Sequence, residues 1–190
     1  SRGLGSRRRK PTEPHRMNNT KIGVPLGLAG PFVSTAALSY GANAVNTVLF
    51  EVSGFSVTLN NVLWDLVSGI NGSHVGFGIY TVTPGSATRG VMLADTGPVN
   101  SQIADQGLKI TPFLTPVTLP CGQYCMAFTT DSASVTALTV NIGAIVPYNG
   151  TPEIFLGTAA NASVAGQLPA LLGVITASNS LKFPTMMLSN

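Results

Sequence analysis

The chain has 190 residues and a formal net charge of +3, and only 9% of its residues are charged. This length suits one domain with a terminal extension, and the charged fraction is far below the roughly 25% of an average soluble domain. Because Gly, Pro, Ser, Thr and Val are frequent while Lys and Glu are scarce, the composition argues against a mainly helical protein and predicts an all-β fold.

The first element in chain order is a basic arm. Residues 1–21 hold seven basic side chains and one acidic side chain, a charge of +6, whereas the rest of the chain carries −3. Prolines stand beside the run Arg7-Arg8-Arg9-Lys10 without any apolar periodicity, so we expect an extended arm that docks onto a partner. The residues predicted to bind that partner are Arg2, Arg7, Arg8, Arg9, Lys10, Arg16 and Lys21.

The partner of the arm has two possible chemistries. The basic run can neutralise nucleic-acid phosphates, which makes binding strongly dependent on salt, or it can pair with acidic residues of a protein. No aromatic residue is interleaved with the arginines, and this weakens stacking on single strands as a binding mode. We therefore expect a protein partner and keep nucleic acid as the alternative.

Residues 22–40 contain Pro25, Pro31 and several glycines, which predicts an extended connector lying over a surface. Residues 22–50 and 156–181 are uncharged, but prolines and polar residues interrupt both stretches. A membrane span needs about 20 predominantly apolar residues, so neither stretch is expected to cross a membrane. The basic amino terminus is not followed by an apolar core, and no signal peptide is predicted.

The body of the chain reads as a series of short strands. Val48, Phe50 and Val52 recur at every second position, the period of a half-buried strand. Gly76 and Gly78 alternate with apolar residues and indicate a bulge or a close backbone approach. Strands are predicted over residues 46–53, 62–67, 75–80, 91–94, 108–111, 124–129 and 135–146.

Seven or eight short strands with intervening turns are typical of an antiparallel β-sandwich, here of jelly-roll-like type, over residues 41–148. The inward positions expected of the last strand are Thr136, Leu138, Val140 and Ile142. Residues 149–190 are rich in Ala, Gly and Ser. We expect them to form an irregular tail that packs on the sandwich or on a sister chain.

Three segments carry a resemblance to a known family. They are the strand Val75-Gly76-Phe77-Gly78-Ile79-Tyr80, the segment Val91-Met92-Leu93-Ala94-Asp95-Thr96-Gly97-Pro98-Val99, and the turn Leu119-Pro120-Cys121-Gly122 that leads into the aromatic strand Gln123–Asp131. With the tail residues 155–172, they resemble a β-sandwich domain of tailed-bacteriophage virion proteins, found in tail fibres, spikes, baseplates and head appendages. The resemblance covers residues 36–190, and the arm lies outside it.

This resemblance implies a non-enzymatic virion component that needs no cofactor. It also implies a homotrimer whose arm anchors it to a neighbouring head, portal, tail or baseplate protein. Two alternatives remain open. One is an icosahedral coat protein whose basic arm faces RNA, and the other is a receptor- or carbohydrate-binding module that uses the loops at residues 83–89 and 149–153.

Cys121 and Cys125 depart from the family pattern. On an extended strand, residues four apart are separated by about 13 Å, whereas a disulfide needs Cα atoms within about 7 Å. We therefore favour two buried thiols, although a turn at residues 122–123 leaves a bridge possible. Zinc is not expected, because only His15 and His74 could add ligands.

No motif in the body predicts catalysis. His74 stands beside Ser73 but has no orienting acid in the sequence around it, so we interpret it as structural. Asp95 and Asp105 could form the carboxylate pair of a glycosidase, but we interpret them as solvated turn residues. Asp131 suits a turn in which it accepts backbone hydrogen bonds. We predict that the chain is not an enzyme.

Overall fold

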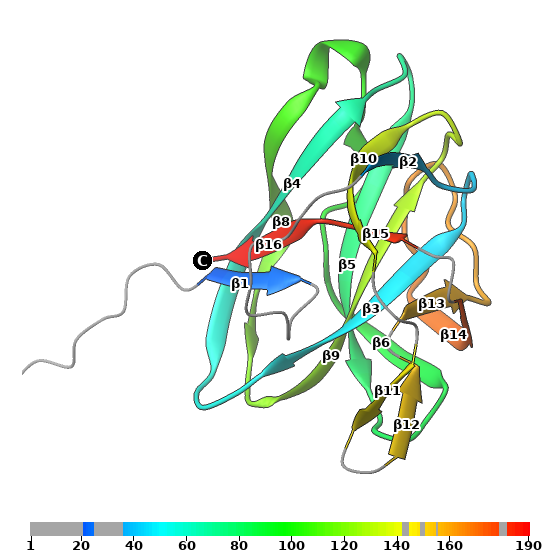
Figure 1. The fold of residues 1–190 in the computed structure, drawn as a ribbon. Helices are drawn as coiled ribbons and strands as arrows, with labels where there is room; N and C mark the ends of the chain where they lie inside the picture. Colours follow the sequence, from blue (N-terminus) through cyan, green and yellow to red (C-terminus); the bar gives the residue numbers. More distant parts are fainter. Residues whose placement is uncertain (1–20, 25–35, 142–144, 149–150, 155, 179–181) are drawn as a thin grey trace, which may run out of the picture.

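The fold is all-β, as predicted, and its paired strands are antiparallel (Figure 1). A computed structural model describes residues 21–24, 36–141, 145–148, 151–154, 156–178 and 182–190. Within these ranges no α-helix occurs, and the helical geometry is confined to one 3₁₀ turn, η1 (Ile103–Asp105). The description below is limited to these residues.

The strands fall into two large sheets and a separate hairpin. An open sheet contains β1 (Lys21–Val24), β2 (Ala36–Ser39), β4 (Val57–Ser68), β8 (Gly107–Leu119), β10 (Thr136–Asn141), β15 (Lys182–Pro184) and β16 (Met186–Ser189). A second sheet contains β3 (Val45–Val52), β5 (His74–Val82), β6 (Thr88–Asp95), β7 (Val99–Asn100), β9 (Gly122–Thr130), β13 (Leu156–Ala159) and β14 (Leu171–Ala177). The hairpin pairs β11 (Ile145–Tyr148) with β12 (Thr151–Ile154).

The second sheet closes on itself. Its strands follow the order β6-β14-β13-β3-β9-β5, and β5 pairs again with β6. These six strands therefore form a barrel, with β7 added along β5. Closure removes the free edges that an open sheet would expose. The strand pattern of the sequence did not predict this closure.

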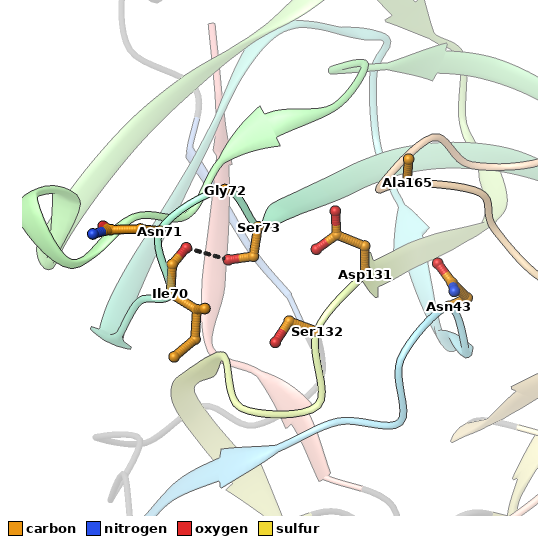
Figure 2. Close-up of a pocket in the computed structure, with 8 residues that line it drawn as sticks. All are labelled: Asn43, Ile70, Asn71, Gly72, Ser73, Asp131, Ser132 and Ala165. Carbon is orange, nitrogen blue, oxygen red and sulfur yellow. Dashed lines mark hydrogen bonds between the residues drawn. The ribbon is translucent and has the colours of Figure 1, made fainter.

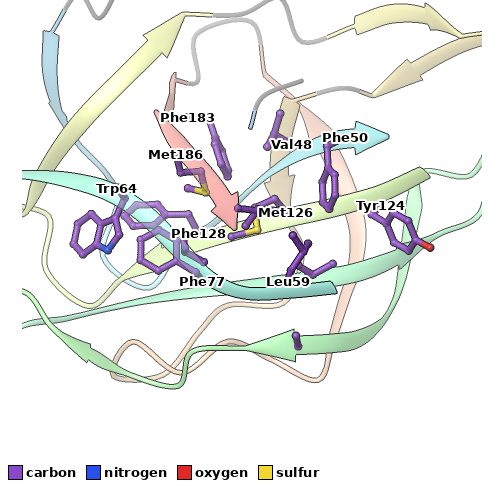
Figure 3. Close-up of a cluster of buried hydrophobic side chains, with 14 of the residues drawn as sticks. Val48, Phe50, Leu59, Trp64, Phe77, Tyr124, Met126, Phe128, Phe183 and Met186 are labelled. Atoms are coloured by element: carbon purple, nitrogen blue, oxygen red, sulfur yellow. The ribbon is translucent and has the colours of Figure 1, made fainter. Parts of the chain in front are cut away.

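The main core lies between the open sheet and one side of the barrel (Figure 3). The Trp64 ring on β4 lies 5.0 Å from Phe77 on β5, measured between ring centroids. Phe77 in turn lies 5.3 Å from Phe128 on β9, and Tyr40 packs edge-on against Phe128 at 4.8 Å. Such tilted and edge-on ring pairs add to the free energy gained from apolar burial. The aromatic chain thus joins the two sheets.

The barrel encloses a smaller core. Its buried side chains are Val45, Leu49, Tyr80, Cys125, Ala127, Ala159, Leu168, Leu172 and Ile175. Val48, Phe50 and Val52 on β3 belong instead to the main core, which confirms that these three share one face. Since successive residues of a strand point to opposite faces, β3 is buried on both sides, and so are β5 and β9.

Two expectations about the C-terminal half are wrong. In β10 the buried residues are Ala137 and Thr139, whereas Thr136 and Leu138 are only half-buried. The register with β4 shifts between Thr136 and Ala137, and Ala137 then faces the core opposite Leu66. The other two predicted inward positions, Val140 and Ile142, have side chains outside the described part.

The C-terminal tail is not irregular, because its strands enter both sheets. β13 and β14 complete the barrel, and β16 pairs with both β4 and β1. Residues 22–40 also differ from a simple connector. Their described ends lie in β1, which pairs with β16, and in β2, which pairs with β10. These segments contain many small residues, so their sequence lacks the apolar alternation by which strands are predicted.

We predict that Phe128→Ala lowers the free energy of unfolding by about 3–5 kcal/mol, because the ring is fully buried and its loss leaves a cavity between the sheets. Phe55→Ala is the matched control, since that ring is 56% exposed, and its effect should stay within about 0.5 kcal/mol. Urea denaturation followed by circular dichroism measures both. Equal effects of the two substitutions would contradict the assigned core.

Candidate functional site

Four chain segments meet at one end of the barrel and border an open hollow of about 450 Å³ (Figure 2). They are the turn before β3, the turn between β4 and β5, the chain leaving β9, and the hairpin turn that contains Ala165. The cavity is lined by Asn43, Ile70, Asn71, Gly72, Ser73, Asp131, Ser132 and Ala165. We call it the loop-end pocket. None of these residues was predicted from the sequence to bind a ligand.

Asp131 in the wall of this pocket is held by His74. Its Oδ1 accepts a hydrogen bond from the His74 backbone N–H at 2.8 Å, and its Oδ2 lies 2.9 Å from His74 Nδ1. The Asp131 backbone N–H donates back to the His74 carbonyl oxygen at 3.1 Å. The contacts with His74 therefore fix the orientation of the carboxylate in the pocket wall.

The expectation that His74 lacks an orienting acid is wrong. The acid lies 57 positions further along the chain, and the antiparallel pairing of β5 with β9, which sets Val75 opposite Thr130, brings it beside the imidazole. Asp131 accepts a backbone hydrogen bond, as predicted, but from another strand and not from its own turn. No local pattern in the sequence indicates this contact, because it depends on strand register.

The His74–Asp131 pair is not extended into a catalytic triad by any residue that the structure describes. A triad needs a nucleophile hydrogen-bonded to the second imidazole nitrogen. The neighbouring Ser73 hydroxyl is instead bonded to the Ile70 carbonyl at 2.7 Å and lies 2.9 Å from the Ser101 hydroxyl. The pair therefore positions the pocket wall.

Backbone hydrogen bonds hold the four segments. The Asn43 N–H donates to the Thr130 carbonyl at 2.7 Å, and the Ser163 N–H donates to the Asn43 carbonyl at 3.0 Å. In the turn between β4 and β5, the Ile70 N–H donates to the carbonyl of Ser101, which follows β7, at 2.8 Å. The lining groups are therefore held in place before any ligand arrives.

Asn43 and Ala165 have backbones in the left-handed region, with φ of 62° and 49°. Within the described ranges, they are the two non-glycine residues with positive φ, and both line the loop-end pocket. Asparagine adopts this conformation readily, whereas for alanine it costs about 1–2 kcal/mol. Such strain persists where the surrounding structure imposes it, and it is common at functional sites.

Gly76 explains why the Ala165 turn can sit so close to the strands. A Cβ atom at this position would lie 2.1 Å from the Gly166 carbonyl oxygen, so only glycine lets the turn approach β5. The expectation that Gly76 marks a close backbone approach is confirmed. The same turn also packs on His74, since a Cβ on Gly166 would lie 2.7 Å from the His74 Cβ.

The barrel interior holds a second group of polar side chains. Arg89 is only 2% exposed, and its Nη1 donates to the Ser86 carbonyl at 2.6 Å. Burial raises the pKa of the Cys125 thiol to about 12, although Arg89 and Thr47 beside it lower the pKa in part. Tyr80 donates its hydroxyl to the Pro169 carbonyl at 2.6 Å, and burial raises its pKa as well.

The two cysteines have different surroundings. Both are free thiols, Cys125 buried and Cys121 exposed, so the prediction of two buried thiols holds for Cys125 and is wrong for Cys121. Cys121 lies in the turn between β8 and β9, where it faces solvent. In the described part of the chain, no group of three or more His, Cys, Asp or Glu residues could hold a metal ion.

Asp95 and Asp105 do not act as a pair. Asp95 accepts a hydrogen bond from Gln167 Nε2 at 2.9 Å, whereas Asp105 lies 3.2 Å from Lys109 Nζ. The second contact borders another cavity of about 410 Å³ beside β8. In that cavity, Trp64 donates its indole N–H to Thr111 Oγ1 at 2.9 Å.

The predicted partner-binding residues of the arm, Arg2 to Arg16, lie outside the described residues. Lys21 begins β1, where its backbone stands opposite Ser189. The loop at residues 83–89 lies between β5 and β6, and residues 149–153 are described only from β12 onward. Neither loop contributes to the loop-end pocket.

No helix of the described part is long and apolar enough to span a membrane. The chain matches no protein-family model, and no curated protein matches it.

We predict that a thiol reagent labels Cys121 and not Cys125 in the folded protein, because the thiolate is the reactive form and a pKa of about 12 suppresses it at Cys125. Mass spectrometry after iodoacetamide treatment at pH 8 should find one adduct, and two adducts in denaturant. Cys121→Ser should abolish labelling of the folded protein. Rapid native labelling of this variant would contradict the closed barrel.

Asp131→Asn should lower the free energy of unfolding by about 1–3 kcal/mol, because the amide replaces a carboxylate that accepts two hydrogen bonds from His74. Asp65→Asn is the control, since Asp65 lies on the open sheet away from the pocket. Thermal unfolding of the two variants tests this. A loss no greater than that of the control would show that the pair does not stabilise this end of the barrel.

Proposed function

We propose that the chain is a non-enzymatic structural component of a bacteriophage virion, which docks through its basic N-terminal arm onto a neighbouring virion protein and assembles as a homotrimer. The proposal includes the jelly-roll-like sandwich as the fold type. What supports that fold type is the packing of the open sheet against β3, β5 and β9 through one shared core. The proposed location is the virion.

The observation that carries the proposal is a row of exposed and half-buried apolar side chains across the open sheet. Met187 on β16 stands opposite Leu63 on β4, and Leu63 stands opposite Ile110 on β8. Leu108 lies two residues along β8 and is 73% exposed, while Ile110 is 66% exposed. A soluble monomer seldom leaves a continuous apolar row in water. We infer that a sister copy covers this row.

The distribution of charge favours docking of the arm onto another protein. Among the body side chains that the structure describes, the cationic ones are Arg89, which is buried, and Lys109, which pairs with Asp105. Lys182 begins β15, and its side chain lies outside the described part. Glu51 is exposed, and Asp65 is half-buried beside the apolar row. The strong positive charge of the molecule is thus concentrated in residues 1–21, a distribution that steers the arm toward an acidic surface of another protein.

The position of β1 links the arm to this face. β1 adds to the open sheet beside β16, with Gly23 opposite Met187. Gly23, Met187, Leu63 and Ile110 therefore lie in one cross-strand row. The arm precedes β1 directly, so its first docking contacts start beside the apolar row. One surface of a neighbouring protein can therefore contact both the arm and the apolar row.

Deletion of residues 1–20 should leave a folded body that no longer joins virions, because it removes five arginines and Lys10 while keeping β1. Incorporation is measured by complementing a phage that lacks the gene and blotting purified particles. Normal incorporation of the deletion variant would overturn arm docking. Assembly of the purified chain into closed shells that contain nucleic acid would favour the coat-protein alternative instead.

Ile110→Lys should convert the homotrimer to a monomer, because it places a charge in the centre of the proposed contact. Val174→Lys on β14 is the matched control, since Val174 is an apolar residue of the barrel with 52% exposure. Sedimentation velocity gives the oligomeric state of each variant, and circular dichroism confirms that each is folded. A wild-type protein that stays monomeric, or equal effects of the two variants, would contradict the proposed interface.

A further inference from the structure

The loop-end pocket has a lining that none of the proposals above uses. We propose that it binds a saccharide, recognised through hydroxyl groups by Asn43, Asn71, Asp131 and Ser132. Its volume of about 450 Å³ falls within the range of about 300–1,000 Å³ of small-molecule sites. The inference does not depend on arm docking, because the pocket is formed by the barrel end and not by the arm.

The charged and polar groups of the lining indicate which class of ligand the pocket binds. The described residues of the lining provide one carboxylate, two side-chain amides and two serine hydroxyls, and none of them is a Lys or an Arg. A phosphate or carboxylate ligand would therefore meet the negative Asp131 without a compensating cation. Amide, hydroxyl and carboxylate groups together donate and accept hydrogen bonds, as sugar hydroxyls do.

Asn43 has a side-chain oxygen without a partner. Its Oδ1 is buried and accepts no hydrogen bond from any described residue. Burying such an acceptor costs about 1–3 kcal/mol, and a ligand hydroxyl that donated to it after a rotation of the side chain would remove this cost. The left-handed backbone of Asn43, with φ of 62°, sets the direction in which this side chain leaves the backbone.

Asp131 has the geometry of an orienting acceptor. The His74 backbone N–H donates to Asp131 Oδ1, and the His74 imidazole donates to Asp131 Oδ2. The carboxylate therefore cannot rotate, and each of its oxygens can accept a further hydrogen bond. Figure 2 shows Asp131 between Ser73 and Asn43, with Asn71 at the opposite side of the labelled group. Hydroxyls on neighbouring sugar carbons can therefore contact groups from separate segments.

A metal cation fits this pocket less well. Ca²⁺ takes six to eight oxygen ligands, usually with several carboxylates, whereas Asp131 is the one acidic side chain among the described residues of this lining. The described residues contain no cluster of the usual metal-ligating side chains. The lining therefore favours a saccharide over a cation, and binding of a cation is an alternative outcome of the test.

The test is an NMR titration of the ¹⁵N-labelled full chain with neutral sugars, namely glucose, galactose, mannose and N-acetylglucosamine, and separately with CaCl₂. We expect at least one sugar to shift the amide signals around Asn43, Asn71 and Ser132, with a Kd on the order of 1 mM. Failure of all four sugars to shift these signals at a hundredfold higher concentration would overturn the proposal. Shifts at these residues with CaCl₂ alone would do the same.

Two variants test the assignment. Asn43→Gly keeps a residue that tolerates the left-handed backbone and removes the amide, and Asn71→Ala truncates a second amide in an exposed turn. Each should weaken sugar binding at least tenfold. Asn161→Ala is the matched control, because Asn161 bonds the Leu171 carbonyl outside the pocket, and its binding should equal that of the wild type. Undiminished binding by both pocket variants would place the sugar elsewhere.

Discussion

The structure depends on three strands that are buried on both faces. β3, β5 and β9 each present one set of side chains to the open sheet and the other set to the barrel interior. Phe77 and Phe128 contribute the large rings of the main core, whereas Cys125 and Ala127 contribute small side chains to the barrel. A strand in such a position cannot shift register by one residue, because large and small side chains would exchange places in two cores at once.

This constraint also determines the geometry of the loop-end pocket. Three of the four segments around the pocket enter or leave these same three strands, and the fourth, the turn that contains Ala165, packs on β5. Their positions therefore follow from packing that lies well below the surface. The His74–Asp131 contact closes the β5–β9 pair at that end. The hydrogen bonds between Asn43, Thr130 and Ser163 then fasten the remaining segments. A pocket built in this way needs little rearrangement to bind a ligand.

The sequence predicted the all-β class and most of the central strands, because Val48, Phe50 and Val52 show the period of two on a face that meets large apolar residues. Barrel closure was not predictable from that pattern. The inner face of the barrel holds Gly76, Gly78, Thr47 and Ala127, which are small or polar and look like exposed or loop positions. For the same reason the strands near the C-terminus were taken for an irregular tail.

The site was less predictable than the fold. Asp131 and His74 are far apart in the sequence, and only the pairing of β5 with β9 makes them neighbours. Asn43 and Ala165 have no sequence motif either, because their relevance comes from their backbone conformation and from the cavity they share. Side chains that act through long-range register leave no local pattern to read.

The contribution of the last strands affects how the protein folds during synthesis. β14 closes the barrel through its pairing with β6 and β13, and β1 has its pairing partner in β16, at the opposite end of the chain. The barrel therefore cannot close before β14 has been synthesised, and β1 has no pairing partner before β16 has been synthesised. A product truncated before β16 lacks the strand that holds Lys21, the last residue of the cationic arm, in the open sheet.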